Sequence, residues 1–450
     1  MARNPSCLVV NTLGFEGGAI ASHPNPSSPQ RLKMSRQRVS LHCMPICTRS
    51  HRRPPAPLSS ILARDFMPQT QAGGVISAYV YQLRQLGVKH LELQLCRLRT
   101  RTTAMNLELQ LMDVMRRSLG MVIPVWFPPS LTADQVRENL LVTLHGCEHF
   151  LPWDHVVLVV DGDVRSFPIV QELQESCRQR HGHAFDIIYC AENRGKGYAV
   201  FRGVQWFLEK QNLEYLTIRD ADGDHTLNDL VNLMRLAVAL QKEETYLLII
   251  VGRRNHPHRA LGWIRGEFEA LLNRVLIDAV RFALARRQQV LNTQYFSLSD
   301  EYPDLHSGYK VYSRRVCELM VERTWERQPW VGPEIYRYGV EAVPFIEGVM
   351  AGAVVGEMTR LTKEPDFSSH GAFTRPETNG SVLLWTFLRL GIEPHQAATL
   401  LDNHLPRLTL WTDPQGRATL LELRQYVLER LLRSAQRSNT LCAFKPGSYF

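Results

Sequence analysis

Short, continuously apolar runs alternate with segments of helical spacing from Met121 onward, and this alternation constrains the fold more than any other feature. Runs without alternating polar positions are typical of strands buried on both faces, as in parallel sheets. The intervening helices supply the crossover connections that parallel strands need. The chain is therefore predicted to form an α/β, doubly wound, mostly parallel sheet. Its strands are expected at 121–125, 155–160, 185–190, 213–218 and 246–252, and its helices at 133–146, 169–180, 198–210 and 227–241.

Polar residues follow three of these predicted strands directly. Asp161 follows the second strand, the basic, glycine-flanked stretch 193–197 follows the third, and Asp220-Ala221-Asp222 follows the fourth. In open α/β sheets, ligands bind outside the carboxyl ends of the strands, so these residues are expected to lie together. Two carboxylates one residue apart can hold a hard divalent cation, which keeps open positions for substrate phosphates. The sequence therefore predicts a site for a metal-bound diphosphate.

The rest of the chain is predicted to complete this domain and then to become helical. A long helix is expected at 262–287 and a further strand at 343–353, which together extend the α/β domain over about 119–360. We interpret residues 376–440 as a C-terminal helical appendage and as a candidate surface for homodimerisation. Its amphipathic helices are predicted at 382–390, 395–401 and 418–432.

The first 104 residues differ in composition from the rest. They carry 14 lysines and arginines against three acids, so the net charge of +8 for the whole chain belongs to this segment. Clusters of Pro, Ser and Arg without steady periodicity predict a disordered basic extension. Aromatic side chains that could stack on bases are scarce there, so nucleic-acid binding is not expected. We hypothesise a mis-called start, with the natural chain beginning near Met105, Met112, Met115 or Met121.

Compartment and membrane contact can be predicted from composition. No run of about 18 apolar residues appears, as a membrane-spanning helix would require. No apolar core follows the first basic residue, as it would in a secretory signal. The nine cysteines include no CxxC pair, which favours free thiols in a reducing compartment. We therefore expect a cytoplasmic protein with at most a peripheral contact with a membrane.

Five short motifs follow one another along the predicted sheet. They are Val122-Ile123-Pro124-Val125, Val159-Val160-Asp161-Gly162-Asp163, Asn193-Arg194-Gly195-Lys196-Gly197, Asp220-Ala221-Asp222-Gly223-Asp224-His225 and Ser307-Gly308-Tyr309-Lys310-Val311-Tyr312. In this order they resemble glycosyltransferase family 2, the inverting enzymes with the GT-A fold, across about residues 119–360. The residues of the last three motifs are most similar to those of the dolichyl- or polyprenyl-phosphate mannosyl- and glucosyltransferases. The resemblance implies a hexosyltransferase with the GT-A fold.

The resemblance also implies the ligands and the donor site. The donor would be a nucleotide-diphosphate sugar, GDP- or UDP-linked, and the cofactor Mg²⁺ or Mn²⁺. Asp222 would bind the metal directly, with Asp220 aiding through water or the ribose, and the metal would stabilise the leaving diphosphate. Asp161 would bind the base or ribose. The residues expected to complete the nucleotide-sugar site are Asn193, Lys196, Gly197, Asp220 and Arg253, of which Lys196 would face phosphate.

Inversion requires a general base on the acceptor side. The family often places an acid pair near the start of a late helix, and residues 330–337 occupy that location, with Pro333 in place of the first acid. Glu334 is therefore the predicted base. Asp304 is the second candidate, because the phospho-lipid branch carries an acid before the Ser-Gly-Tyr-Lys motif.

One departure from the family pattern affects the nucleotide pocket, because Trp126-Phe127-Pro128-Pro129 replaces the usual acid after the first strand. The acceptor is expected to be a sugar, another small molecule or a polyprenyl phosphate. A sugar-phosphate nucleotidyltransferase is an alternative, but it would need a Gly-rich basic loop where Trp126 to Pro129 lie. A non-catalytic nucleotide-sugar-binding protein is the alternative from a different class.

Overall fold

The computed structural model describes residues 7–9, 108–241, 246–255, 262–297, 302–324, 334–361 and 375–442. Residue contacts divide the chain into two units, and all described residues belong to the unit formed by Met1–Asn11 and Asn106–Phe450. Apart from Cys7–Val9, the predicted basic extension 1–104 lies outside the described residues, so its predicted disorder stays a prediction.

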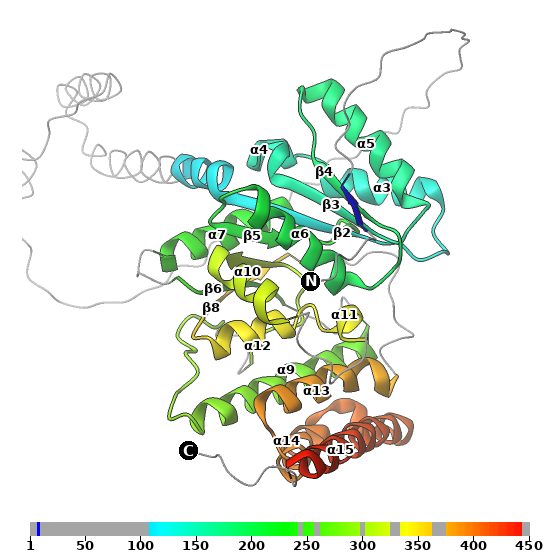
Figure 1. Cartoon of the computed structure of the whole chain (residues 1–450), viewed down its shortest axis with the longest axis vertical. Coiled ribbons are helices and arrows are strands. Elements are labelled where there is room, and N and C mark those ends of the chain that lie inside the picture. The colour runs from blue at the N-terminus through cyan, green and yellow to red at the C-terminus, as the bar shows by residue number, and fades with distance from the viewer. Residues whose placement is uncertain are drawn as a thin grey trace, which may run out of the picture. The chain divides into compact units, whose positions relative to one another are not determined.

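An eight-stranded mixed sheet forms the centre of this unit (Figure 1), in the order β1-β4-β3-β2-β5-β7-β6-β8. The neighbours β4, β3, β2 and β5 are parallel, as are β6 and β8. Strand β7 runs antiparallel to both of its neighbours, and β1 runs antiparallel to β4. The predicted mostly parallel α/β sheet is confirmed. The strands are β1 Cys7–Val9, β2 Leu119–Val125, β3 Val156–Asp161, β4 Asp186–Cys190, β5 Tyr215–Ile218, β6 Leu248–Arg254, β7 Lys310–Ser313 and β8 Val354–Arg360.

Helices cover both faces of the sheet because successive strand residues point to opposite sides. Val122 packs into a cluster with α6, α9, α10 and α12, whereas Ile123 packs into a second cluster with α3, α5, α7 and the helix at 108–118. Both clusters are buried, which explains the continuously apolar strands. The helices are α3 Ala133–Leu144, α4 Cys147–Phe150, α5 Ser166–His181, α6 Lys196–Lys210, α7 Leu227–Gln241, α9 Trp263–Ala285, α10 Arg314–Leu319, α11 Glu334–Tyr338, α12 Val343–Met350, α13 Pro376–Leu390, α14 Pro394–His404 and α15 Pro414–Cys442, with short 3₁₀ or π turns at Trp153–His155, Met320–Thr324, Leu405–Arg407 and Thr409–Thr412.

The predicted strand at 343–353 is wrong, because this segment forms α12 and a turn before β8. Almost every residue of α12 is buried, so the sequence shows no helical periodicity, and a short apolar run cannot be assigned by periodicity alone. Pro344 lies in the first turn of the helix, where it costs no hydrogen bond. Gly348 lets α12 approach β6 closely, because a Cβ there would lie 2.7 Å from Ile249.

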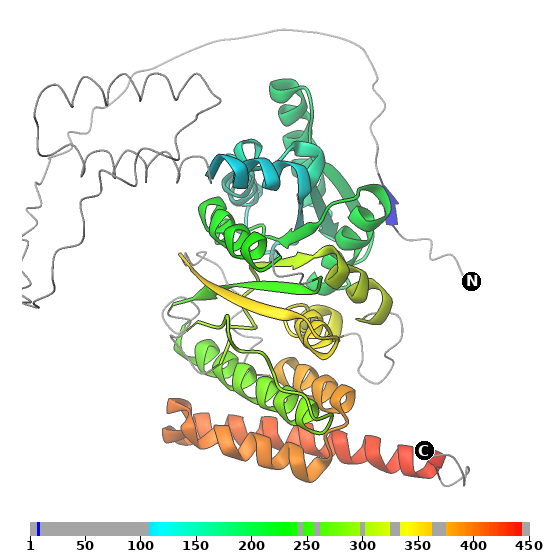
Figure 2. The same cartoon turned by 90° about the vertical axis from the view of Figure 1, so that its left-hand side faces the viewer.

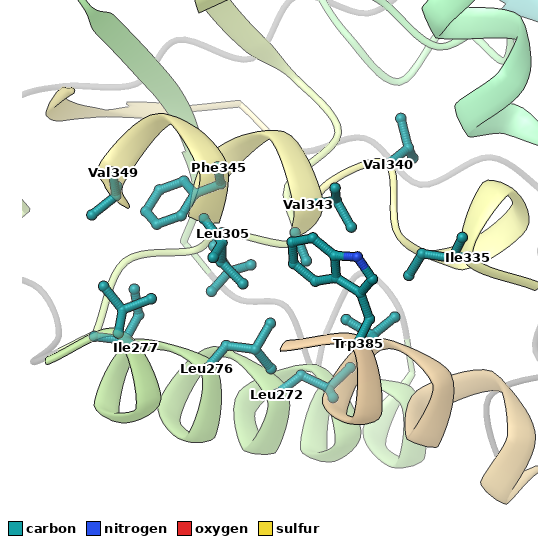
Figure 3. Close-up of a cluster of buried hydrophobic side chains, with 14 of the residues drawn as sticks. Leu272, Leu276, Ile277, Leu305, Ile335, Val340, Val343, Phe345, Val349 and Trp385 are labelled. Atoms are coloured by element: carbon teal, nitrogen blue, oxygen red, sulfur yellow. The ribbon is translucent and has the colours of Figure 1, made fainter. Parts of the chain in front are cut away.

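The C-terminal helices share the core of the α/β sheet. α13 and α14 contact α9, and α15 contacts α13 and α14 as an outer layer (Figure 2). Figure 3 shows the Trp385 indole of α13 between Leu272 of α9 and Val343 of α12. Trp385 is 1% exposed and belongs to the same hydrophobic cluster as Val122 of β2. No helix within the described ranges is both long and apolar enough to cross a bilayer.

Replacing Trp385 by Ala is expected to destabilise the whole unit, because the indole fills the space between three helices. Loss of a buried aromatic side chain typically lowers the free energy of unfolding by about 3–5 kcal/mol. Trp263→Ala is the matched control, since that indole is 44% exposed at the start of the neighbouring helix. Urea unfolding followed by circular dichroism measures both. Equal and small effects of the two substitutions would show that α13 is not part of the cooperative core.

Candidate functional site

The loop after β5, which carries Asp220 and Asp222, is closed by buried polar contacts. Arg219 donates from Nε to the His225 carbonyl at 2.7 Å and also donates to the Thr143 carbonyl. The Asp220 amide donates to Nδ1 of His225 at 3.0 Å, and the His225 ring stacks on Tyr309 of the neighbouring loop with centroids 4.4 Å apart. Burial lowers the pKa of His225 well below its ordinary value, so the ring is neutral and accepts at Nδ1. The backbone of this loop is therefore held in place without a ligand.

The Lys196 ammonium, at the first residue of α6, lies between two carboxylates. Its Nζ is 2.9 Å from Oδ1 and 3.0 Å from Oδ2 of Asp220, and 2.9 Å from Oε1 of Glu341. Gly308 closes the site from the β7 side, since a Cβ there would lie 3.0 Å from Asp220 and 3.2 Å from Lys196. Although burial alone would raise the pKa of Asp220, the charges of Lys196 and Arg360 lower it below its ordinary value.

Asp222 lies in the same loop but has no cationic partner in an ion pair among the described residues. Its Oδ1 accepts a hydrogen bond from the Asp224 amide at 3.1 Å. Burial and the neighbouring charge of Asp220 raise the pKa of Asp222 to about 6. Asp224 is instead held by the buried Arg360 of β8, with N–O distances of 3.1 and 3.3 Å. Of the three aspartates in this loop, Asp222 is thus the one without an ion-pair partner among the described residues.

The stretch 193–197 is fixed by Asp161 at the end of β3. The carboxylate of Asp161 accepts from the Arg194 amide at 3.0 Å and from the Gly195 amide at 2.7 Å. Burial raises the pKa of Asp161, although these two amides favour its charged form. On the outer side, Arg337 of α11 donates to the side chain and to the carbonyl of Asn193 at 2.9 and 3.0 Å. In this structure, Asp161 and Asn193 therefore shape the loop that presents Lys196 and Gly197.

Gly195 cannot accept a side chain without disrupting this loop. Its φ is +105°, and a Cβ would lie 2.6 Å from Cγ and 2.8 Å from Cα of Arg337. Gly195→Ala is expected to lower stability by about 1–3 kcal/mol through strain and to speed amide hydrogen exchange at 193–197. Gly182→Ala is the matched control, because Gly182 also has a positive φ of +76° but nothing within 4 Å of its Cβ position. Equal effects at both glycines would contradict a specific contact between this loop and α11.

Asp304 and Arg253, two of the predicted site residues, form buried ion pairs in the structure. Asp304 accepts from the amide, Nε and Nη2 of Arg254 at 3.0, 2.8 and 2.6 Å, and its side chain is 5% exposed. Although burial would raise the pKa of Asp304, the Arg254 guanidinium lowers it below its ordinary value. Arg253 donates to the Tyr302 carbonyl at 2.9 Å and to Glu357 at 3.3 Å. Both predicted site residues are thus placed in the core between β6 and the loop before β7.

The predicted base, Glu334, is the first residue of α11, and its side chain lies outside the described part of the structure. Residues 325–333 lie outside it as well. Glu341, which was not predicted as a site residue, follows α11 and contacts Lys196 from 145 residues away in the chain. A sequence signal did exist, because Glu341 directly precedes the apolar run that forms α12. That signal is weak, since an acid before an apolar run is common at the surface.

Two features of the loop at Asp220 fit a divalent cation. The Lys196 ammonium already occupies a cation position against both oxygens of Asp220, and the neighbouring Asp222 carboxylate forms no ion pair among the described residues. Carboxylate oxygens are the ligands that Mg²⁺ and Mn²⁺ prefer. Within the described ranges, no group of three or more His, Cys, Asp or Glu side chains could enclose a metal. Asp220 and Asp222 would therefore hold a cation together with oxygens of a substrate.

Solved structures similar to this chain exist, whereas comparisons of its sequence find no match. No protein-family model matches the chain, and no curated protein matches it. Among solved structures, the chain is similar to the mannosyltransferase PcManGT from Pyrobaculum calidifontis in complex with GDP-mannose and Mn²⁺. The identity is 16%, the alignment covers 74% of this chain and 82% of that chain, and the TM-score is 0.38. The function proposed below rests on the residues of this chain.

Proposed function

We propose that this protein is an inverting hexosyltransferase that uses a GDP- or UDP-linked sugar as donor and Mg²⁺ or Mn²⁺ as cofactor. One observation carries the proposal: Asp220 and Asp222 follow the carboxyl end of the parallel strand β5, and the Lys196 ammonium contacts both oxygens of Asp220. Ligands of α/β sheets bind at these strand ends, and two neighbouring carboxylates with a cationic side chain beside them suit a metal-bound diphosphate. The resemblance of the five motifs to glycosyltransferase family 2 agrees with this chemistry.

Different residues of this chain would hold the metal, contact the donor phosphate and position the loop that carries Lys196. A bound divalent cation would supply electrostatic stabilisation of the leaving diphosphate, with Asp220 and Asp222 as its protein ligands. Lys196 would contact phosphate from the start of α6, a 15-residue helix whose N-terminus has no side-chain cap and so can favour an anion. Asp161 and Arg337 hold the loop that presents Lys196. We keep Glu334 as the proposed general base, and we propose that Asp304 and Arg253 stabilise the fold.

A sugar-phosphate nucleotidyltransferase is less consistent with the loop after β2. Such an enzyme would need a Gly-rich basic loop there, but Trp126 to Pro129 occupy this position. The loop is anchored by Asp163, whose buried carboxylate accepts from the Phe127 amide at 3.2 Å and from the Ser166 hydroxyl at 2.6 Å. A non-catalytic nucleotide-sugar sensor would use the same site, so only turnover separates it from a transferase.

Isothermal titration against a panel of GDP- and UDP-sugars, with and without Mn²⁺, tests the proposal most directly. We expect one nucleotide class to bind with Mn²⁺ present and to bind far more weakly without it. Adding a polyprenyl phosphate or a sugar acceptor to the bound complex should then release free nucleoside diphosphate. Binding without turnover on any acceptor and without donor hydrolysis would favour the sensor. Absence of metal-dependent nucleotide binding across the panel would refute the proposal.

The affinity for Mn²⁺ is expected to rise with pH and to level off above about 6. A metal ligand must be deprotonated, and the pKa of Asp222, raised to about 6, keeps this carboxyl partly protonated below that value. Affinity should fall by up to about tenfold per pH unit below 6. Titrations at pH 5, 6, 7 and 8 measure the effect, and Asp154→Asn, at an exposed position, should leave the profile unchanged. A flat profile between pH 5 and 7 would contradict the role of Asp222.

A further inference from the structure

We propose that Lys196 is a resident counter-cation that competes with the divalent metal for Asp220, and that Glu341 retains Lys196 when the metal displaces it. This inference rests on the proposed function. It assigns to Glu341 a positioning role that neither the motifs nor the comparisons supply. In this site the metal and Lys196 would exchange places at the Asp220 carboxylate. Once the metal is bound, the Lys196 ammonium would contact the donor phosphates.

Distances and burial around Lys196 support this exchange. The ammonium lies 2.9 and 3.0 Å from the two oxygens of Asp220, so it covers the edge of the carboxylate that a metal would use. The ammonium also lies 2.9 Å from Oε1 of Glu341, and this contact does not involve Asp220. The Lys196 side chain is 30% exposed and the Glu341 side chain is 17% exposed. A lysine held by both carboxylates can lose one partner and stay within reach of the site. A lysine held by Asp220 alone would be released to solvent.

The charges around the site predict how each substitution changes the affinities for metal and for diphosphate. Among the described residues, the three carboxylates Asp220, Asp222 and Glu341 have only the Lys196 ammonium in ion-pair contact, and the nearby Arg360 is paired with Asp224. These carboxylates therefore stay net negative and attract a divalent ion. When the ion takes Asp220, Lys196 faces an excess of positive charge, which an arriving diphosphate neutralises. Removing Lys196 should therefore strengthen metal binding and weaken diphosphate binding. Removing the charge of Glu341 should weaken metal binding, because Lys196 then pairs with Asp220 alone.

Mn²⁺ affinity of the full-length protein, measured by electron paramagnetic resonance of free Mn²⁺ without any nucleotide, tests the exchange. Lys196→Met is expected to bind Mn²⁺ about tenfold more tightly than the unsubstituted chain, as loss of a nearby unit charge predicts. The same variant, saturated with Mn²⁺, should bind GDP or UDP about tenfold more weakly. Lys196→Arg should keep both affinities near their original values. Lys210→Met, at the other end of α6 and exposed, is the matched control and should change neither.

Glu341→Gln completes a double-substitution cycle. We expect this change to weaken Mn²⁺ binding about tenfold in the original chain and clearly less in the Lys196→Met background, where no competitor remains. If Lys196→Met weakens both metal and nucleotide binding, Lys196 has only a structural role and the inference fails. If Mn²⁺ binding depends on Asp222 but not on Lys196, the inference fails and the proposed function stands. If the original chain binds Mn²⁺ only together with GDP or UDP, the inference fails and the proposed function stands. If it binds Mn²⁺ neither alone nor with GDP or UDP, both fail.

Discussion

Asp222→Asn is expected to abolish metal-dependent glycosyl transfer while making the metal-free protein more stable at neutral pH. The substitution removes a proposed metal ligand, and metal stabilisation of a leaving diphosphate is worth several kcal/mol, so turnover should fall by about a thousandfold or more. The raised pKa of Asp222, about 6, shows that its charge is unfavourable in the folded state without metal. The neutral amide removes that unfavourable charge. Loss of function and gain of stability should therefore appear together.

The sign of the stability change follows from proton linkage. Because the folded-state pKa of Asp222 lies above its ordinary value of 3.8, the folded state binds a proton more tightly than the unfolded state. This group therefore lowers the stability of the metal-free protein as pH rises from about 4 to about 6, and the loss stays constant above that range. Thermal unfolding of the metal-free variant and of the original chain at pH 4.5 and 7.5 measures the difference. Asp154→Asn is again the control, and a variant that is less stable at pH 7.5 would contradict the assignment.

Arg254→Met is expected to give the largest loss of stability outside the hydrophobic core. Arg254 is 4% exposed on its side chain and compensates two buried carboxylates, with N–O distances of 2.6 Å to Asp304 and 2.6 Å to Glu269. Removing one partner of a buried ion pair leaves uncompensated charge and typically costs about 3–5 kcal/mol. Urea unfolding measures the effect. Arg424→Met is the matched control, because its pair with Asp402 has similar distances of 2.6 and 2.8 Å but lies at the surface. Exposed pairs contribute about 0–1 kcal/mol.

Measurements of stability and turnover also distinguish the two candidate bases, Glu334 and Asp304. If Asp304 stabilises the fold, Asp304→Asn should lower the free energy of unfolding, because an amide cannot replace a carboxylate opposite Arg254. If Asp304 is the general base, the variant should lose turnover while keeping its stability. Glu334→Gln should show the second pattern under the present proposal, with donor binding retained. A stable but inactive Asp304→Asn variant would therefore reverse the assignment of the base.

The fold could be predicted largely from local sequence patterns, with one instructive exception. The five predicted strands are mostly apolar runs, and each observed strand lies within a few residues of its predicted position, because burial leaves the same local signal. The segment 343–350 has that signal too, but it forms α12. It is buried between α9, the sheet and α13, so its sequence resembles that of a buried strand. A helix surrounded by protein shows no polar face. Local patterns cannot distinguish it from a buried strand.

The candidate site was predicted only in part, for a related reason. The polar strand ends at Asp161 and Asp220 are properties of the local sequence, and strand order brings them to one edge of the sheet. Which charged side chains meet there depends on contacts between residues that are far apart in the sequence. Sequence alone predicted Arg253 and Asp304 as site residues, and it could not show that they form buried ion pairs with Glu357 and Arg254. Glu341 was not identified, although it contacts Lys196 at 2.9 Å.

The sequence by itself determined the α/β class and the positions of most strands and helices, and it pointed to a carboxylate pair at a strand end. Hydrophobic periodicity repeats over a few residues, so it can be read without knowing the fold. Only the tertiary structure decided the partners of the charged side chains. Lys196 meets Asp220 and Glu341, which are 24 and 145 residues away in the chain, because ion pairs depend on distances of a few ångströms in space.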